Sequence, residues 1–502
     1  MNAQRISPVS LVRALGAWGG DGPLHRCLTS RLRLLVLDGR LPLDARLPSE
    51  RALSEALGVS RTTVATAYDA LRESGYARSR RGSGTVVALP GPVHAAPAVP
   101  GAEGMLDLGR ASLPAAALVP EAVRAAAEEL PRYLPDSGYD GRGLPHLRAE
   151  IAGYYSARGL PTDPAQVLVT LGAQHAIHLL AQVLVRPGDR ALLEAPTYPH
   201  ALDALRAARA RVLTMPVAVG PEASSSADGW DVESGIGTLR RARPALAYLM
   251  PDLHNPTGAT MPSADRERLV AAAAEAGTAV LSDETTALLR LEAQSSAEAA
   301  LPRPLGAEGN GPGSGGGRAR GAGGVVHIGS AGKLFWGGLR VGWIRADRGL
   351  IERLVAARTS FDLGTPVVEQ LAVALLLRRL PEVLAERAGQ LSAGARALAR
   401  LSARHLPDWE VPEARGGLTV WARLPHPASS SLALAAHARG VLLPAGPRFG
   451  PDGAAFERFV RMPLTAGPKE WQAAMPALAA AWQEACSGGV PPRQRPLPDV
   501  VV

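Results

Sequence analysis

Short apolar runs alternate with Ala- and Leu-rich helical stretches between residues 105 and 486. This alternation predicts a mainly parallel sheet covered by helices, so the fold class of this region is α/β. Ligands of such sheets bind beyond the carboxyl ends of the strands, and candidate chemistry should therefore follow directly after the runs. The runs are Val167–Leu171, Ala191–Glu194, Ala245–Met250, Ala279–Leu281 and Val325–Ile328.

A helix-turn-helix pattern precedes this region. Leu24–Leu37 has a helical apolar face. Ser49 is a suitable N-cap for a helix that ends before Gly58, and Ser60 is a suitable N-cap for a second helix that ends near Ser74. The positions of the second helix that should face inward are Val64, Ala67, Tyr68 and Leu71.

The first turn of the second helix then projects Arg61, Thr62 and Thr63 outward, where base edges would be read. Two short strands follow and form a basic hairpin, or wing, whose Arg80 and Arg81 suit phosphates. The pattern predicts a winged helix-turn-helix. The residues alone leave one alternative, a helical hairpin with a solvated arginine face.

Composition divides the chain further. Residues 88–104 are rich in Pro, Ala and Gly and predict a linker between domains at 1–87 and 105–486. Gly-rich residues 303–324 predict a disordered insertion, and residues 487–502 an unstructured tail. We expect a cytoplasmic protein without a membrane segment, because no run approaches 18 apolar residues and no secretory signal is evident. Two cysteines at opposite ends of the chain offer no metal-ligand spacing, so no metal is expected.

Charge is distributed unevenly along the chain. Residues 1–90 contain 13 Arg against seven Asp and Glu, whereas the whole chain has a net charge of +8. This asymmetry indicates a first domain that binds nucleic acid and a second that binds something else. Lysine is nearly absent: Lys333 and Lys469 are the two in the sequence. Arginine cannot form a Schiff base, so each lysine needs separate examination.

Lys333 follows the strand that ends at Ile328, in a loop rich in Gly and Ser, with Arg340 seven positions later. An amine that must meet an aldehyde beside a bound phosphate needs such a setting, although a merely exposed lysine is the alternative. Lys469, near the C-terminus, lacks these surroundings and should be solvated.

Three other segments predict partners for the same ligand. Gly172-Ala173-Gln174 opens a helix whose free N–H groups favour a phosphate. Asp283 follows an apolar run and suits a protonated pyridine nitrogen, which would make the ring an electron sink. Asn255 in HNPTG could donate to a phenolic oxygen of the ring.

The quoted segments carry a family resemblance. LPSERALSEALGVSRTTV with the following GSGTVV resembles the GntR family of winged-helix regulators. In order along the chain, YDGRGLPHLR, TLGAQHA, EAPTYPHA, HNPTG, LSDE, SAGK and FVRMP resemble fold-type I aminotransferases. Together they resemble the MocR subgroup of GntR regulators. The resemblance implies a pyridoxal-phosphate domain with a smaller C-terminal α+β subdomain, a homodimer, a double-stranded DNA operator and an amine or amino-acid effector.

The resemblance also implies roles for single residues. Lys333 matches the Schiff-base lysine, Asp283 the partner of the pyridine nitrogen, and Asn255 the partner of the ring hydroxyl. Arg461 matches an arginine that clamps a carboxylate, the alternative being a surface salt bridge. The remaining matches are Tyr198 stacked on the ring, Ala173, Gln174, Ser330 and Arg340 around the phosphate, Tyr139 reaching the phosphate of a neighbouring subunit, and Arg51, Arg61, Thr62 and Thr63 on DNA.

Three positions depart from the family pattern. Gly332 stands where a serine is usual, Thr285 where a tyrosine is usual, and His200 where the regulators often have an arginine that bears on the effector. The first two departures are compatible with cofactor binding and argue against efficient transamination. The leading hypothesis is thus a regulator that senses an amine, an amino acid or pyridoxal phosphate. The alternatives are a working aminotransferase with an accessory DNA-binding module, and a DNA-binding protein whose large domain is a degenerate dimerisation scaffold.

Overall fold

A computed structural model describes residues 5–16, 18–19, 22–37, 41, 45–80, 84–88, 105–218, 229–291, 301–307, 324–451 and 455–486. The chain forms two compact units: residues 1–110, 397–411 and 421–502 in the first, and residues 111–396 and 412–420 in the second. The predicted linker lies outside the described residues except at its first position, so the boundaries at 87 and 105 stay predictions. The predicted tail also lies outside them.

The first unit contains the winged helix-turn-helix. Ser49 Oγ accepts the Ala52 N–H at 3.2 Å and Ser60 Oγ accepts the Thr63 N–H at 3.1 Å, so both predicted N-caps are confirmed. The four positions predicted to face inward are buried in one apolar core. The elements are α1 (Pro8–Leu15), α2 (Leu24–Leu37), α3 (Glu50–Leu57), α4 (Arg61–Glu73), β1 (Ala77–Arg80) and β2 (Gly84–Val87), with β1 and β2 antiparallel.

The C-terminal part of this unit is a small α+β arrangement. β12 pairs with β14, β13 pairs in parallel with β3, and α15 packs on α16. The bounds are β3 (Leu106–Asp107), β12 (Thr419–Arg423), α15 (Ser429–Ala438), β13 (Val441–Leu442), the 3-10 helix η4 (Gly446–Phe449), β14 (Phe459–Pro463) and α16 (Pro468–Cys486). Helix α14 (Leu380–His405) and strand β12 each contribute residues to both units.

An eight-stranded sheet of order β4-β11-β10-β9-β8-β5-β6-β7 forms the centre of the second unit. Strands β10, β9, β8, β5 and β6 are parallel, β11 is antiparallel to both β10 and β4, and β7 is antiparallel to β6. The strands are β4 (Val167–Thr170), β5 (Arg190–Ala195), β6 (Arg211–Ala218), β7 (Gly229–Trp230), β8 (Leu246–Leu249), β9 (Ala279–Asp283), β10 (Val325–Ser330) and β11 (Gly342–Arg345). All five predicted apolar runs are strands of this sheet.

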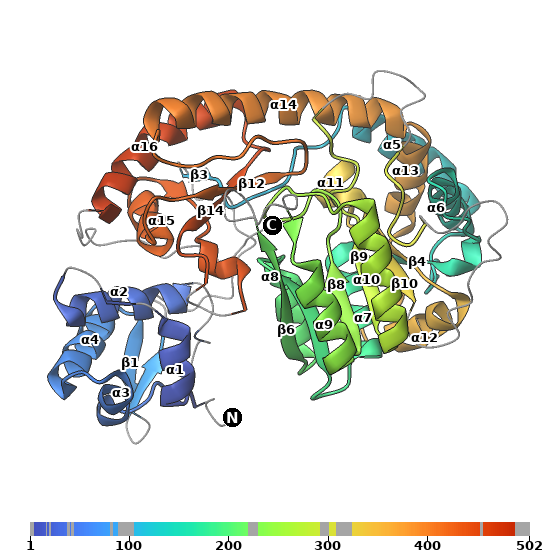
Figure 1. Ribbon diagram of the computed structural model, residues 1–502. Coiled ribbons are helices and arrows are strands. Elements are labelled where there is room, and N and C mark those ends of the chain that lie inside the picture. The colour runs from blue at the N-terminus through green and yellow to red at the C-terminus, as the bar shows by residue number, and fades with distance from the viewer. Residues whose placement is uncertain are drawn as a thin grey trace. The chain divides into compact units, whose positions relative to one another are not determined.

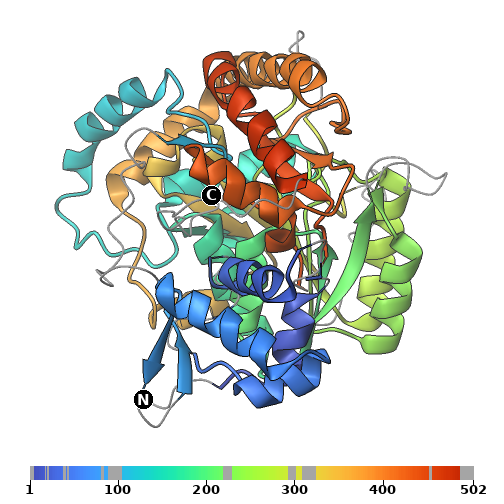
Figure 2. The ribbon, with the colours of Figure 1, turned by 90° about the vertical axis from the view of Figure 1, so that its left-hand side faces the viewer.

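Helices cover both faces of the sheet, as the α/β prediction requires. Side chains of α7, α8 and α12 share one apolar cluster with the strands, and those of α9 and α10 share another. Figures 1 and 2 show α9 and α10 together on one side of the sheet. The helices are α5 (Val119–Glu129), α6 (Pro145–Ala157), α7 (Ala173–Leu184), α8 (Pro199–Ala207), α9 (Val232–Ala242), α10 (Ser263–Ala276), α11 (Ala331–Leu334), α12 (Arg348–Arg358) and α13 (Val367–Arg378), with 3-10 turns η1 (Leu130–Arg132), η2 (Pro164–Gln166) and η3 (Gly337–Leu339).

The start of the predicted insertion needs correction. Residues 303–307 are part of the described structure, and Leu305 and Ala307 are buried. Leu305 belongs to the apolar cluster beneath α9 and α10, which gives this end of the segment a packed position despite its composition. Residues 308–323 lie outside the described residues. Within the part of the chain that is described, no helix has the length and apolarity needed to cross a membrane.

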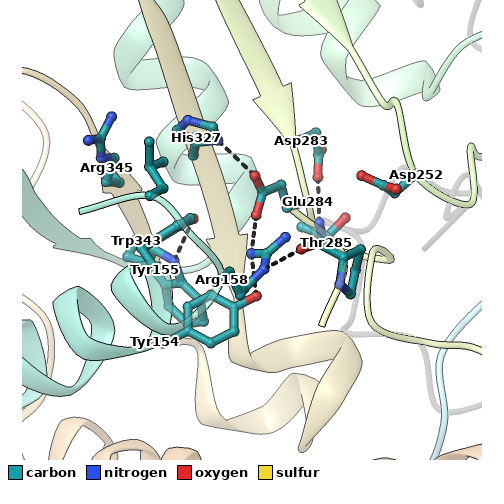
Figure 3. Close-up of polar contacts among 12 residues, drawn as sticks. Tyr154, Tyr155, Arg158, Asp252, Asp283, Glu284, Thr285, His327, Trp343 and Arg345 are labelled. Carbon is teal, nitrogen blue, oxygen red and sulfur yellow. Dashed lines mark hydrogen bonds and ion pairs between the residues drawn. The ribbon is translucent and has the colours of Figure 1, made fainter. Parts of the chain in front are cut away.

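A buried ion pair anchors the end of β9. Arg158, the C-cap residue of α6, donates to Glu284 Oε2 at 2.5 Å, and His327 Nδ1 on β10 lies 2.7 Å from Glu284 Oε1 (Figure 3). Both charged side chains are almost wholly buried. Burial by itself raises the pKa of Glu284, but the attraction of Arg158 and the contact with His327 outweigh it and lower the pKa to about 2.

Glu284→Gln is expected to lower the thermal unfolding midpoint at neutral pH, because it leaves the Arg158 guanidinium buried without its counter-charge. Removing one partner of a buried pair costs about 3–5 kcal/mol. The folded pKa of Glu284 lies below that of an unfolded glutamate, so the pair stabilises fully above about pH 5 and loses its effect as the pH falls toward 2. Calorimetry across this range should show the gap between wild type and variant narrowing in acid.

A double variant, Arg158→Met with Glu284→Gln, provides the control. It removes the uncompensated charge and should recover part of the lost stability. A gap that is absent at neutral pH, or that stays constant down to about pH 3, would contradict this account of the pair.

Candidate cofactor site and DNA-binding surface

One edge of the sheet gathers most of the candidate residues of the second unit. Strands β4, β5, β8, β9 and β10 run in the same direction, so their carboxyl ends share this edge, and the antiparallel β11 begins there. The segments after these strands carry Gln174, Tyr198, Asn255 and Lys333, and Asp283 is the last residue of β9. The structure thus places the lysine and the aspartate at the carboxyl ends of neighbouring strands.

A turn between β4 and α7 lies against the guanidinium of Arg340. Gly172 precedes the helix with a φ of +91°, and a Cβ on it would lie 3.2 Å from Arg340 Nη2. The same guanidinium donates to Leu171 O at 3.0 Å. A Cβ at Gly342 would lie 2.6 Å from the carbonyl carbon of Gly172. The turn and β11 can therefore come this close only because residue 342 is a glycine. Free N–H groups of α7 and the Arg340 cation therefore lie together, an arrangement suited to an anion.

Lys333 lies on the short helix α11, directly after β10. Ser330 caps this helix by accepting the Gly332 N–H at 3.0 Å, so its hydroxyl is held at the end of the strand. The partly buried Lys333 Nζ donates to Ala111 O at 2.9 Å. Lys469, by contrast, is exposed at the start of α16, as its surroundings in the sequence predict.

Asp283 is the last residue of β9 and is only 2% exposed. Its Oδ1 accepts the Thr285 N–H at 3.0 Å, and its Oδ2 accepts the Tyr248 hydroxyl at 2.6 Å (Figure 3 shows the first of these contacts). Burial raises the pKa of Asp283, while the hydrogen bonds from Tyr248 and Thr285 oppose the rise. The Asp283 carboxylate is therefore buried and held in orientation by uncharged donors, an arrangement that favours the binding of a cationic group.

Tyr198 and His200 lie at the start of α8. Their rings meet edge to face at 5.3 Å, and His200 Nδ1 lies 3.5 Å from Asp203 Oδ2. Gln174 Nε2 donates to His200 O at 3.1 Å, which connects the first turns of α7 and α8. Asn255 lies in the loop between β8 and α10 and is half-buried.

Tyr139 and Arg461 are not on the segments that follow these strands. Tyr139 is 73% exposed, and its N–H is 3.4 Å from Ser137 Oγ. Arg461 belongs to the first unit, where it is fully buried on β14, donates to Gly109 O and lies over the Phe449 ring. Its burial excludes the surface salt bridge that the sequence left open.

The DNA-binding candidates on α3 and α4 lie at least partly on the outside of the winged helix-turn-helix. Arg61 and Thr62 are exposed in the first turn of α4, and Thr63 Oγ1 lies 2.8 Å from Ser60 Oγ. Arg51 is exposed on α3 and pairs with Glu55. Arg80 ends β1, whereas Arg81 lies outside the described residues. The observed fold excludes the simple helical hairpin.

Sequence reasoning missed several polar residues at the strand ends. Tyr248 on β8 donates to Asp283, and the fully buried Glu194 on β5 accepts from Trp230 Nε1 and the Met250 N–H. Thr197 Oγ1 is buried without a hydrogen-bond partner in the described part of the chain. A polar side chain inside an apolar strand, as in YLM or LLEA, was the available signal.

Comparison with known proteins identifies two families. Residues 105–478 match the family described as aminotransferase class I and II, and residues 26–87 match the bacterial regulatory proteins of the gntR family. The first match alone covers most of the chain.

Individual relatives and a solved structure match long stretches of this chain. The chain is 30% identical over 449 residues to a probable rhizopine catabolism regulatory protein MocR of Rhizobium meliloti, covering 80% of this chain and 82% of that protein. It is 28% identical to the transcriptional regulator TauR of Rhodobacter capsulatus, covering 85% and 90% of the two chains. Among solved structures, the α-aminoadipate aminotransferase LysN of Thermus thermophilus, in complex with a phosphopyridoxyl-leucine, superposes with a TM-score of 0.65 at 28% identity, covering 77% and 94%.

These matches span both units and agree with the winged helix-turn-helix and the α/β sheet. The chain therefore belongs to the MocR group of GntR-family transcription regulators, in which a DNA-binding winged helix-turn-helix is joined to a pyridoxal-phosphate-dependent domain of the aminotransferase class I and II family.

Proposed function

We propose that the strand-end edge of the second unit holds pyridoxal phosphate through Lys333, and that an amine, an amino acid or the cofactor itself acts there to change the affinity of the winged helix-turn-helix for DNA. The observation that carries the proposal is the convergence of five parallel strand ends, each followed by a residue of suitable chemistry. Coupling between the two sites requires an effector that binds two conformations unequally.

The phosphate would be held where α7 begins. The N–H groups of Ala173 and Gln174, the Ser330 hydroxyl and the Arg340 guanidinium are the donors, and together they supply hydrogen bonds and positive charge. One feature supports this fit: the lack of a Cβ at Gly172 leaves room beside Arg340.

Tyr198 would stack on the ring. The carboxylate of Asp283 would accept a hydrogen bond from the protonated pyridine nitrogen. Asn255 would donate to the ring oxygen. When bound, the cofactor supplies an aldehyde that condenses with amines and a ring that withdraws electrons. The protein's part is to present the Lys333 amine, to orient the ring and to keep a negative charge at its nitrogen.

The finer partners rest on the resemblance. Arg461 would bind an effector carboxylate bidentately, since its guanidinium is buried and fixed, and His200 would contact the effector beside Tyr198. We further propose a homodimer, which suits a module that reads two half-sites on DNA. The exposed Tyr139 suits a side chain that acts on the site of a neighbouring subunit.

Lys333→Ala is expected to abolish the visible absorbance that the purified protein acquires with pyridoxal phosphate, because it removes the amine that the aldehyde condenses with. Borohydride should fix the cofactor to Lys333 in the wild type, as peptide mass spectrometry can show. Lys469→Ala is the matched control and should retain the band in full, since this lysine is exposed in the first unit. A band that survives in Lys333→Ala and is lost in Lys469→Ala would refute the assignment.

Arg61→Ala is expected to weaken binding to the operator upstream of a neighbouring gene by about 1–3 kcal/mol, roughly fivefold to a hundredfold, through the loss of a base or phosphate contact. Footprinting and titration at one fixed salt concentration measure the change. Arg240→Ala, which truncates a similarly exposed arginine on α9, is the control and should bind as the wild type does. Equal effects of the two variants would mean that Arg61 contributes net charge alone.

A measurement of transamination distinguishes the proposed regulator from a working aminotransferase. Transfer of an amino group from an amino acid to a keto acid at ordinary enzymatic rates, without a DNA footprint, would favour a working aminotransferase. The threonine at position 285 argues for slow turnover, because it lacks the phenol that the resemblance expects beside Asp283. Loss of the cofactor on dialysis would instead favour a degenerate scaffold.

A further inference from the structure

Tyr248 and Asp283 form a buried pair on one face of the sheet. In the β8–β9 register Tyr248 lies opposite Leu281, and Asp283 follows two positions later, so the two side chains project from the same face. Both residues are at most 2% exposed. The pairing is therefore a consequence of strand order and register.

The contact between them is short and charge-assisted. The Tyr248 hydroxyl donates to Asp283 Oδ2 at 2.6 Å, within the range of hydrogen bonds from a hydroxyl to a carboxylate. A tyrosine hydroxyl has a single proton to donate, and here it is directed at the carboxylate. Burial and the neighbouring Asp283 charge raise the pKa of Tyr248 well above its ordinary value, so the phenol stays protonated in the working pH range.

Other groups of the described chain also act on this pair. Glu194 on β5 acts on both members, and Tyr198 acts on Tyr248. Thr285 donates its N–H to the other carboxylate oxygen of Asp283. None of these three brings a positive charge, so the donors that favour the ionised carboxylate are Tyr248 and Thr285. Tyr248 contributes its side-chain hydroxyl alone, whereas Thr285 contributes both its backbone N–H and its side chain.

We propose that Tyr248 is a positioning residue that holds Asp283 ionised and oriented, and so decides whether the proton between Asp283 and the pyridine nitrogen of the cofactor lies on the nitrogen. This inference rests on the proposed function, because it requires the cofactor at Asp283. A hydrogen bond to the carboxylate favours the pair of carboxylate and protonated ring over the pair of carboxylic acid and neutral ring. Tyr248 acts through Asp283, and its effect is on a proton equilibrium.

The test compares wild type, Tyr248→Phe and Tyr155→Phe, each loaded with pyridoxal phosphate carrying ¹⁵N in the ring. In Tyr248→Phe we expect the nitrogen resonance to move toward that of the neutral ring. We also expect the pH midpoint of the visible band, which reports the proton on the nitrogen of Lys333, to rise by about one unit, a tenfold change. A ring without a proton on its nitrogen withdraws electron density less strongly, so the lysine nitrogen holds its own proton more tightly.

Tyr155→Phe is the matched control. Tyr155 is also fully buried beneath the sheet, and its hydroxyl accepts from Trp343 Nε1 at 3.2 Å (Figure 3). Its loss should lower stability without moving either spectroscopic signal. Signals in Tyr248→Phe that match those of the wild type would overturn the inference, and so would the same displacement in both variants.

A second substitution covers the case in which Tyr248→Phe does not fold. Site-specific 3,5-difluorotyrosine at position 248 keeps the ring and the hydroxyl but makes the phenol a stronger donor. The pH midpoint should then fall, opposite to the Tyr248→Phe shift, and an unchanged midpoint would overturn the inference. Failure of the wild type to show a borohydride-fixable band at Lys333 is a different result: it overturns the proposed function, and this inference with it.

Discussion

The parallel alignment of β4, β5, β8, β9 and β10 is the constraint on which the candidate site depends. Parallel strands end at the same edge, so residues separated by some 160 positions, from Gln174 to Lys333, are brought to one side of the sheet. Because these strands are buried on both faces, their apolar side chains hold the alignment through packing. The polar residues can then occupy the strand ends at no cost to the core.

Two consecutive acidic residues at this edge illustrate how surroundings decide a carboxylate's role. Asp283 and Glu284 are both buried, yet burial raises the pKa of the first, and Arg158 and His327 lower the pKa of the second. The negative charge of Glu284 is compensated within the fold by Arg158, and this ion pair anchors the end of β9. Asp283 is held by the Tyr248 phenol and by the backbone N–H and side chain of Thr285, which are uncharged donors, so its negative charge would be available to a cationic ligand atom.

The scarcity of lysine limits which residues of the second unit can condense with an aldehyde. Arginine supplies nearly all basic charge, including the guanidinium of Arg340 beside α7 and that of Arg461 on β14. Arginine binds phosphates and carboxylates but does not condense with aldehydes. In the second unit the proposed condensation would therefore be confined to Lys333, and Arg340 would act on the phosphate as a binding group only.

Local patterns predicted part of the elements of this protein: five strands of the sheet, and the helices and wing of the helix-turn-helix. Ser49 and Ser60 cap helices through their own side chains, and the apolar runs form strands because burial follows composition; both are short-range effects that a sequence shows directly. Lys333, Asp283, Asn255 and Gln174 were found because they follow those runs, and the other candidates came from the family resemblance. The pairing of Tyr248 with Asp283 and of Arg158 with Glu284 depended on strand order and helix packing, which join residues 35 and 126 positions apart. Local sequence carries no signal for contacts over such distances. The tertiary structure alone therefore decided that Glu284 is paired with an arginine and that Asp283 is not.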